Sequence, residues 1–222
     1  MILPQPSATW LVITHLGSAG IMLPMLVMIS AGLWLAGQQS ALLTWMLAMT
    51  AGVAVVLASK IAFIGWGWGS ASLNFTGISG HTMLASSVFP VWMGWLLAGP
   101  TRRFSLYGVM LGLAIGAVVG WSRLVLGAHS PSEVIVGWLL GMGISLVACK
   151  AMRGQVSFRG WNTLAAALLL LTFSPSLSGY LPTHQWEVRL ALALSGHARP
   201  YVRQDLHRPA LADIRSPNLT WH

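Results

Sequence analysis

The chain has 222 residues, of which 55% are hydrophobic and only 7% are charged. With a mean hydropathy of +0.71, this composition is typical of integral membrane proteins and excludes an ordinary soluble domain. The formal net charge of +8 comes from basic residues in short polar stretches and in the C-terminal region. We therefore expect the charge to serve membrane topology and contact with the lipid bilayer, with no nucleic acid as a partner.

Six apolar segments approach the length that a helix needs to cross a bilayer, about 20 residues. They lie at about 17–37, 41–64, 82–99, 104–122, 133–150 and 160–180. The sequence therefore predicts an all-α fold, a polytopic membrane helix bundle of about six transmembrane helices, over residues 1–180. The remainder, 181–222, is predicted to be a basic C-terminal tail. Its stretch HQWEVRLALALSG can lie along the membrane interface as an amphipathic helix.

Glycine recurs at every fourth position on two of these segments. Gly112, Gly116 and Gly120 lie on the fourth segment, and Gly137 and Gly141 lie on the fifth. This spacing places the glycines on one face of each helix, where neighbouring backbones approach closely in lipid. We expect these positions to serve helix packing.

Basic residues indicate the orientation of the bundle. Arg102 and Arg103 lie in the loop after the third segment, and Lys150 begins another basic loop after the fifth. The positive-inside rule places both loops in the cytoplasm, so that the loops 65–81 and 122–132 face the opposite side. The same alternation puts the arginine-rich tail outside, against the positive-inside tendency, and the side of the tail stays open.

Ionisable groups gather beside the predicted outer face: Lys60, His81, Arg123, His129 and Glu133. Taken singly, Lys60 is explained as an anchor at a helix end and His81 as a capping residue. Charges at the mouth of a membrane bundle are costly, however, and mark functional sites by default. The convergence of all five on one face favours a shared site.

The residue types in this group suit a phosphate ester, because lysine and arginine provide fixed positive charge for phosphate oxygens. Ser79 and Gly80 precede a predicted helix whose first N–H groups attract anions, and the glycine lets a ligand approach the backbone. Glu133, four residues after His129, can hold one imidazole nitrogen and leave the other free. His81 can then act as a general acid. The pattern predicts a phosphate site that requires no metal and no cofactor.

Two other interpretations of these residues remain open. The two histidines and Glu133 could bind zinc, although Lys60 and Arg123 are unfavourable neighbours for a cation. Ser79 or Ser122 could be the nucleophile of a serine hydrolase, although the sequence lacks a nucleophile elbow.

Two motifs, SRLVLGAHSPSE and ISGH, resemble signatures of the type 2 phosphatidic acid phosphatase superfamily. The first is similar to Ser-Arg-x5-His-x3-Asp, with Glu133 in the aspartate position, and the second to Pro-Ser-Gly-His, with Ile78 in place of proline. The motifs and their flanking helices cover about residues 55–150. A further signature, Lys-x6-Arg-Pro, is only half present, because Lys60 fits its lysine whereas Gly67 stands in place of its arginine.

The missing arginine removes one expected cation from the site. Loss of a charged hydrogen bond to a phosphoryl group costs about 1.5–3 kcal/mol of binding. Several groups could compensate: the N–H of Trp66 or Trp68, Asn74, Thr76, or an arginine of the tail.

The resemblance implies a metal-independent lipid phosphatase with defined residue roles. His129 would attack phosphorus to form a phosphohistidine, and Glu133 would orient it. His81 would protonate the leaving oxygen and then help to activate water. Four residues would hold the phosphoryl oxygens: Lys60, Ser79, Gly80 and Arg123.

The substrate implied by the resemblance is a lipid phosphate or pyrophosphate, such as polyprenyl pyrophosphate, phosphatidic acid, phosphatidylglycerophosphate or lipid A phosphate. The expected location is a bacterial inner membrane, with the active site facing the periplasm. Two alternatives stay open: phosphate transfer from lipid to lipid, and a non-catalytic lipid-binding role on the same fold. The sequence indicates neither the lipid nor the oligomeric state.

Overall fold

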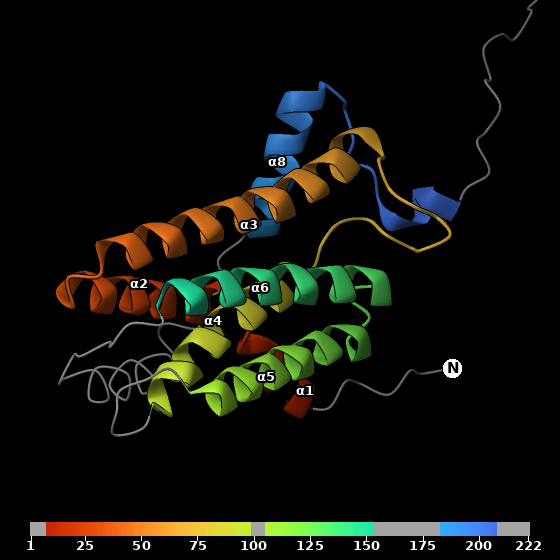
Figure 1. Ribbon diagram of the computed structural model, residues 1–222. Helices are drawn as coiled ribbons and strands as arrows, with labels where there is room; N and C mark the ends of the chain where they lie inside the picture. The colour runs from red at the N-terminus through yellow and green to blue at the C-terminus, as the bar shows by residue number, and fades with distance from the viewer. Residues whose placement is uncertain (1–7, 99–104, 153–182, 208–222) are drawn as a thin grey trace, which may run out of the picture.

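The computed structural model describes residues 8–98, 105–152 and 183–207, and within these ranges the chain is helical and contains no β-strand. The longer elements, in chain order, are α1 (Ala8–His15), α2 (Ala19–Leu35), α3 (Gln39–Trp66), α4 (Gly80–Leu96), α5 (Leu106–Val125) and α6 (Pro131–Ala151) (Figure 1). After a gap follow α8 (Thr183–Ser195) and the short 3-10 helix η1 (Arg203–His207). The predicted all-α class is confirmed.

The first five predicted segments correspond to α2 through α6, and their ends differ from the observed ones by at most three residues. The chain before the first segment is also helical, because α1 continues into α2 after a short break. Four described stretches are long and apolar enough to cross a membrane: Ala8–Leu35, Gln39–Trp66, Leu106–Val125 and Pro131–Ala151. The sixth predicted segment, 160–180, lies outside the described residues.

The centre of the bundle is α4, a helix of 17 residues that is buried along most of its length. It packs against α5 and α6 and also contacts α2 and α3. Its buried hydroxyls bond within the helix, since Ser86 Oγ donates to the Thr82 carbonyl at 2.7 Å and Ser87 Oγ to the Leu84 carbonyl at 2.9 Å. Polar side chains are therefore accommodated inside the apolar core without unpaired hydroxyls.

The glycine ridges of α5 and α6 face α4. A Cβ atom added at Gly116 would lie 2.9 Å from the Cα atom of Ser86, and one added at Gly137 would lie 2.7 Å from the carbonyl oxygen of Ser79. The other glycines of both ridges leave equally little room. The predicted close packing is confirmed, and it draws the beginnings of α4 and α6 together.

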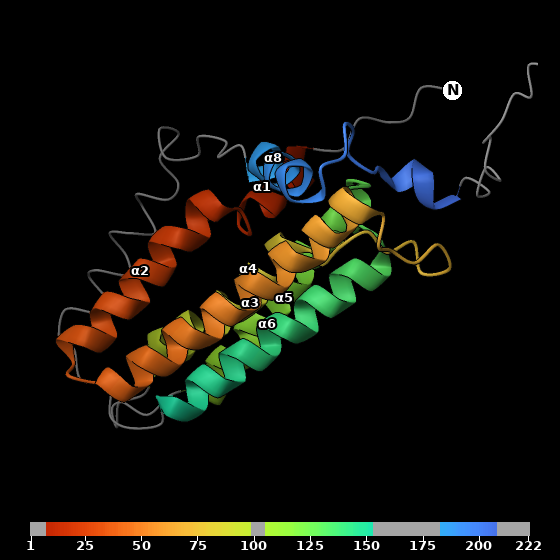
Figure 2. The ribbon, with the colours of Figure 1, turned by 90° about the horizontal axis from the view of Figure 1, so that it is seen from above.

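Successive long helices run in opposite directions, so their ends meet at two faces of the bundle (Figures 1 and 2). One face holds the end of α3, the beginning of α4, the end of α5 and the beginning of α6. There α8 crosses the direction of the bundle and packs on the end of α3, where Ala191 is buried against Phe63 and Ile64. The described part of the predicted tail is therefore joined to the bundle, while its place at the membrane interface stays a prediction.

Close packing of α5 on α4 can be tested by adding one methyl group. We expect Gly116→Ala to lower the unfolding temperature of the purified protein in detergent, because overpacking a core costs about 1–3 kcal/mol. The matched control is Gly143→Ala on α6, where nothing lies within 4 Å of an added Cβ atom. The control should be neutral or slightly stabilising. Equal unfolding temperatures for the two variants would contradict this account of the packing.

Candidate active site

All seven predicted site residues lie at the face where α3 ends and α4 begins. They are Lys60 in the last turns of α3, Ser79, Gly80 and His81 at the start of α4, Arg123 in the last turn of α5, His129 just before α6, and Glu133 in the first turn of α6. The charges of Lys60 and Arg123 act on both histidines. The structure thus brings the predicted residues of four helices into one site.

His129 and Glu133 form a hydrogen-bonded pair. Nδ1 of His129 lies 2.7 Å from Oε2 of Glu133, whose side chain is completely buried. An ionised carboxylate can only accept hydrogen bonds, so Nδ1 carries the proton, and in the neutral imidazole Nε2 then keeps its lone pair. The backbone N–H of Ser130 donates to the same oxygen at 3.1 Å, which holds the carboxylate against the start of α6. The free Nε2 is therefore available to a ligand.

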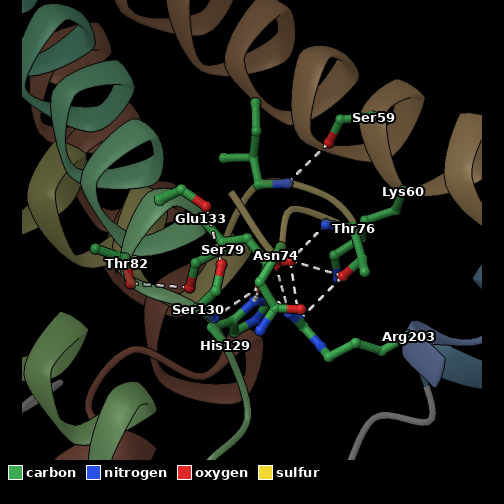
Figure 3. Close-up of polar contacts among 12 residues, drawn as sticks. Ser59, Lys60, Asn74, Thr76, Ser79, Thr82, His129, Ser130, Glu133 and Arg203 are labelled. Carbon is green, nitrogen blue, oxygen red and sulfur yellow. Dashed lines mark hydrogen bonds and ion pairs between the residues drawn. The ribbon is translucent and has the colours of Figure 1, made fainter. Parts of the chain in front are cut away.

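The second oxygen of Glu133 is held by the loop before α4. Thr76 donates to Oε1 twice, from its backbone N–H and from its hydroxyl, each at 2.6 Å. Nη2 of Arg203 lies 2.9 Å from Oε1 and 2.8 Å from Oε2 and thus bridges the carboxylate (Figure 3). Charged and backbone donors together compensate the cost of burying this ion.

The same loop fixes the start of α4. The backbone N–H of Ile78 donates to Ser59 Oγ on α3 at 3.0 Å, and that of Ser79 donates to the carbonyl of Glu133 on α6 at 3.2 Å (Figure 3). Gly77 approaches α3 so closely, at a φ of +149°, that a side chain would not fit. The N-terminus of α4, whose first N–H groups attract anions, is thereby held beside His129.

The hydroxyls of the two serines considered as nucleophiles point to other partners. Ser79 Oγ lies 2.9 Å from Thr82 Oγ1 in the core, and Ser122 Oγ donates to the carbonyl of Val119 at 2.6 Å. Neither hydroxyl contacts a histidine in the described chain. The part of the chain that the structure describes also contains no group of three or more potential metal-ligating side chains. The serine-hydrolase and zinc interpretations gain no support.

Two cations of the site have partners that the sequence did not indicate. Nη1 of Arg123 donates to the hydroxyl of Thr14 at 2.8 Å, which ties the end of α5 to α1. Nζ of Lys60 forms an ion pair with Glu187 of α8 at 2.8 Å. An anion that binds at this face would compete with Glu187 for Lys60.

Arg203 was not singled out by the sequence, where it is one of several arginines of the tail. Its Nη1 donates to the carbonyl of Asn74 at 2.6 Å, and its Nη2 contacts Thr76 Oγ1 at 3.0 Å as well as Glu133. The absence of an arginine seven residues after Lys60 is the only sequence signal that a cation should come from elsewhere.

Burial lowers the pKa of His129 from its ordinary value, and the charges of Arg123 and Lys60 add to this effect. The hydrogen bond and charge of Glu133 oppose it without cancelling it. Because protonation occupies the lone pair, a lowered pKa keeps His129 neutral and nucleophilic at neutral pH.

Comparison with known proteins agrees with this geometry. The profile of the PAP2 superfamily matches residues 58–157, a range that includes every predicted site residue. A Klebsiella pneumoniae protein, described as "Uncharacterized 22.5 kDa protein in cps region", is 36% identical over 214 residues, which is 90% of this chain and 99% of that protein. No solved structure matches the chain.

The fold is a bundle of apolar helices, and its candidate site holds the His129–Glu133 pair beside the cations Lys60 and Arg123. The chain belongs to the PAP2 superfamily. This membership supports a phosphatase-type activity and a membrane location.

The protonation state of His129 can be measured without any assay of activity. We expect NMR titration of the labelled imidazole to give a pKa below about 6.5, the ordinary value for histidine. Glu133→Gln should lower it further, because the substitution removes the negative charge that favours the protonated ring. A wild-type value above 6.5, or a higher value in the variant, would contradict the electrostatics of the pair.

Proposed function

We propose that the protein hydrolyses a lipid phosphate or pyrophosphate through a phosphohistidine intermediate on His129. The observation that carries the proposal is the 2.7 Å pairing of His129 with the buried Glu133, beside Lys60 and Arg123. A neutral imidazole with one nitrogen held by a carboxylate and the other free is an activated nucleophile.

The first step transfers the phosphoryl group to the enzyme. Nε2 of His129 attacks phosphorus while the bond from phosphorus to the leaving lipid oxygen breaks, and His81 donates a proton to that oxygen. In the second step water attacks phosphorus, the P–N bond breaks, inorganic phosphate leaves and His129 is restored, with His81 accepting a proton from the water. Each step moves one phosphoryl group and one proton, and no other reactant is needed.

Positive charge around the phosphoryl group stabilises both transition states. Lys60 of α3, Arg123 of α5 and the N-terminus of α4 at Ser79 and Gly80 are the proposed donors to the three oxygens that carry the charge. The N–H and hydroxyl of Ser79 already bond to Glu133 and Thr82, so Ser79 can donate to phosphate only if one of these bonds is released or rearranged. Burial and then the charges of Arg123 and Lys60 disfavour the protonated form of His81, and the proposal requires the negative charge of a bound phosphate to oppose them. Substrate binding thus prepares the general acid.

An apolar groove on the surface of the bundle supports a lipid as the substrate. The groove has a volume of about 350 Å³ and lies between α3 and α6. It is lined by small and aliphatic side chains, among them Ala48, Gly52, Val55, Leu139 and Ile144. It starts within two helical turns of Lys60 and Glu133 on the same helices, so a hydrocarbon chain in the groove would leave its headgroup near the site.

The four lipid phosphates named above remain the candidate substrates, and the proposed location is a bacterial inner membrane with the site on the periplasmic face. Lys150, in the last turn of α6, lies at the end of the bundle opposite the site, which agrees with a cytoplasmic position for that end.

Phosphate release by the purified protein tests the proposal. We expect release from at least one lipid of a panel of mono- and pyrophosphates, and His129→Ala should reduce it about 10³-fold or more, because removal of the nucleophile removes the intermediate. Acid-quenched samples should contain a phosphoenzyme that the variant lacks. His184→Ala is the control, since this histidine is 80% exposed on α8.

The same assay separates the alternatives. Labelled phosphate that appears on an added lipid acceptor, and not as free phosphate, would indicate phosphotransfer. Equal release by the wild type and His129→Ala, or no release from any lipid of the panel, would overturn the proposal and favour a lipid-binding role.

Vanadate provides a probe of Lys60, because it occupies the position of the phosphoryl group. We expect Glu187→Gln to tighten vanadate inhibition by up to about fivefold, since the partly exposed ion pair that competes for Lys60 contributes about 0.2–1 kcal/mol. Lys60→Met should weaken inhibition. Weaker inhibition in Glu187→Gln would show that Lys60 does not receive the phosphate.

A further inference from the structure

The C-terminal segment beyond α8 is attached to the end of α3, beside the site. The backbone N–H of Tyr201 donates to the carbonyl of Ile64 at 2.9 Å, and Nδ1 of His197 lies 2.6 Å from the carbonyl of Gly65. These contacts join a part of the chain that is distant in sequence to the last turn of α3 and place η1 beside the loop before α4 (Figure 1).

The segment also takes the space of the missing arginine. Gly67, at the position where the related signature has arginine, ends α3 with a φ of +72°, and a Cβ atom there would lie 3.0 Å from the ring of Tyr201. A side chain at this position would be strained by the positive φ and crowded against Tyr201. Arg203, two residues beyond Tyr201, brings a guanidinium to the site from the other direction.

The guanidinium is directed at Glu133 and its surroundings. Nη2 contacts both carboxylate oxygens and the hydroxyl of Thr76, and Nη1 donates to the carbonyl of Asn74 (Figure 3). The side chain of Arg203 is 33% exposed, whereas that of Glu133 is completely buried. Both Nη atoms are committed to groups of the protein, so the arginine acts on the carboxylate and through it on His129.

We propose that the C-terminal segment is part of the active site and that Arg203 is a positioning residue, which clamps Glu133 and thereby keeps Nε2 of His129 aimed at the phosphorus atom. This inference rests on the proposed function for its catalytic consequence. Nη2 contacts both carboxylate oxygens while Nη1 is fixed on the carbonyl of Asn74, and a planar guanidinium held at both nitrogens restricts rotation of the carboxylate.

The clamp also sets the charge balance around His129. The imidazole is surrounded by Lys60 of α3, His81 of α4, Arg123 of α5 and the Glu133–Arg203 pair. Loss of the arginine leaves the negative charge of Glu133 uncompensated, and this favours protonation of His129.

Kinetics of the full-length protein in detergent test the clamp. We expect Arg203→Ala to lower kcat about 10- to 100-fold with little change in KM, because a small misplacement of a catalytic group has an effect of this size. The acid limb of the pH–rate profile should move to higher pH. Arg203→Lys keeps the positive charge and loses the second nitrogen, which bonds to Asn74. In this variant the acid limb of the pH–rate profile should stay near its wild-type position, and kcat should fall less than in Arg203→Ala.

Arg199→Ala is the matched control, because Arg199 belongs to the same segment and is exposed. It should match the wild type in kcat and pH profile. Unfolding temperatures of all three variants show whether a fall in activity comes from misfolding. If Arg203→Ala is misfolded, the kcat and pH profile of Arg203→Lys, which keeps the ion pair with Glu133, test the proposal in its place.

Three outcomes in Arg203→Ala would overturn the proposal. The first is a kcat and pH profile like those of the wild type. The second is a higher KM with unchanged kcat, which would make Arg203 a substrate-binding group, and the third is a rise in activity, which would make the segment inhibitory. Failure of the proposed function is distinguishable, because the wild type would then release no phosphate. NMR titration of His129 still tests the clamp in that case: the pKa should rise in Arg203→Ala and stay unchanged in Arg199→Ala.

Discussion

The structure depends on one buried charge, the carboxylate of Glu133. An ion at this depth in a helix bundle is stable only when donors replace the water it has lost. Its donors come from the loop before α4, from the start of α6, from His129 and from the C-terminal segment. Each of these parts is thereby held in place by the same side chain, so the group that stabilises the site also orders it.

Helix packing brings the donors within reach. Because α5 and α6 carry glycine where they face α4, the three helices approach closely, and the beginnings of α4 and α6 lie side by side. The backbone N–H of Ser79 can then reach the carbonyl of Glu133. Without this approach, the N-terminus of α4 and the His129–Glu133 pair would belong to separate surfaces.

Two ion pairs fasten the C-terminal part of the chain to the site, Lys60 with Glu187 and Glu133 with Arg203. In one pair the C-terminal part supplies the acid and in the other it supplies the arginine, so each side of the contact carries both charges. The course of the C-terminal segment also accompanies the departure from the familiar signature. A glycine after α3 lets Tyr201 pass, and the next turn of the chain carries the guanidinium.

Local pattern was sufficient for the helices and for the pairing of His129 with Glu133. Hydropathy marks a helix in lipid directly. The pairing was predicted from a shared helical face, whereas His129 lies before α6, and the capping of α6 by Glu133, which accepts from the N–H of Ser130, brings the carboxylate to the imidazole. The contacts of Arg203 and Glu187 join residues 70 and 127 positions apart. No periodicity connects such positions, and the tail offers several arginines of similar surroundings in sequence. Only the packing of α8 on α3 decides which of them meets the buried carboxylate, because that packing sets where the chain turns back over the site.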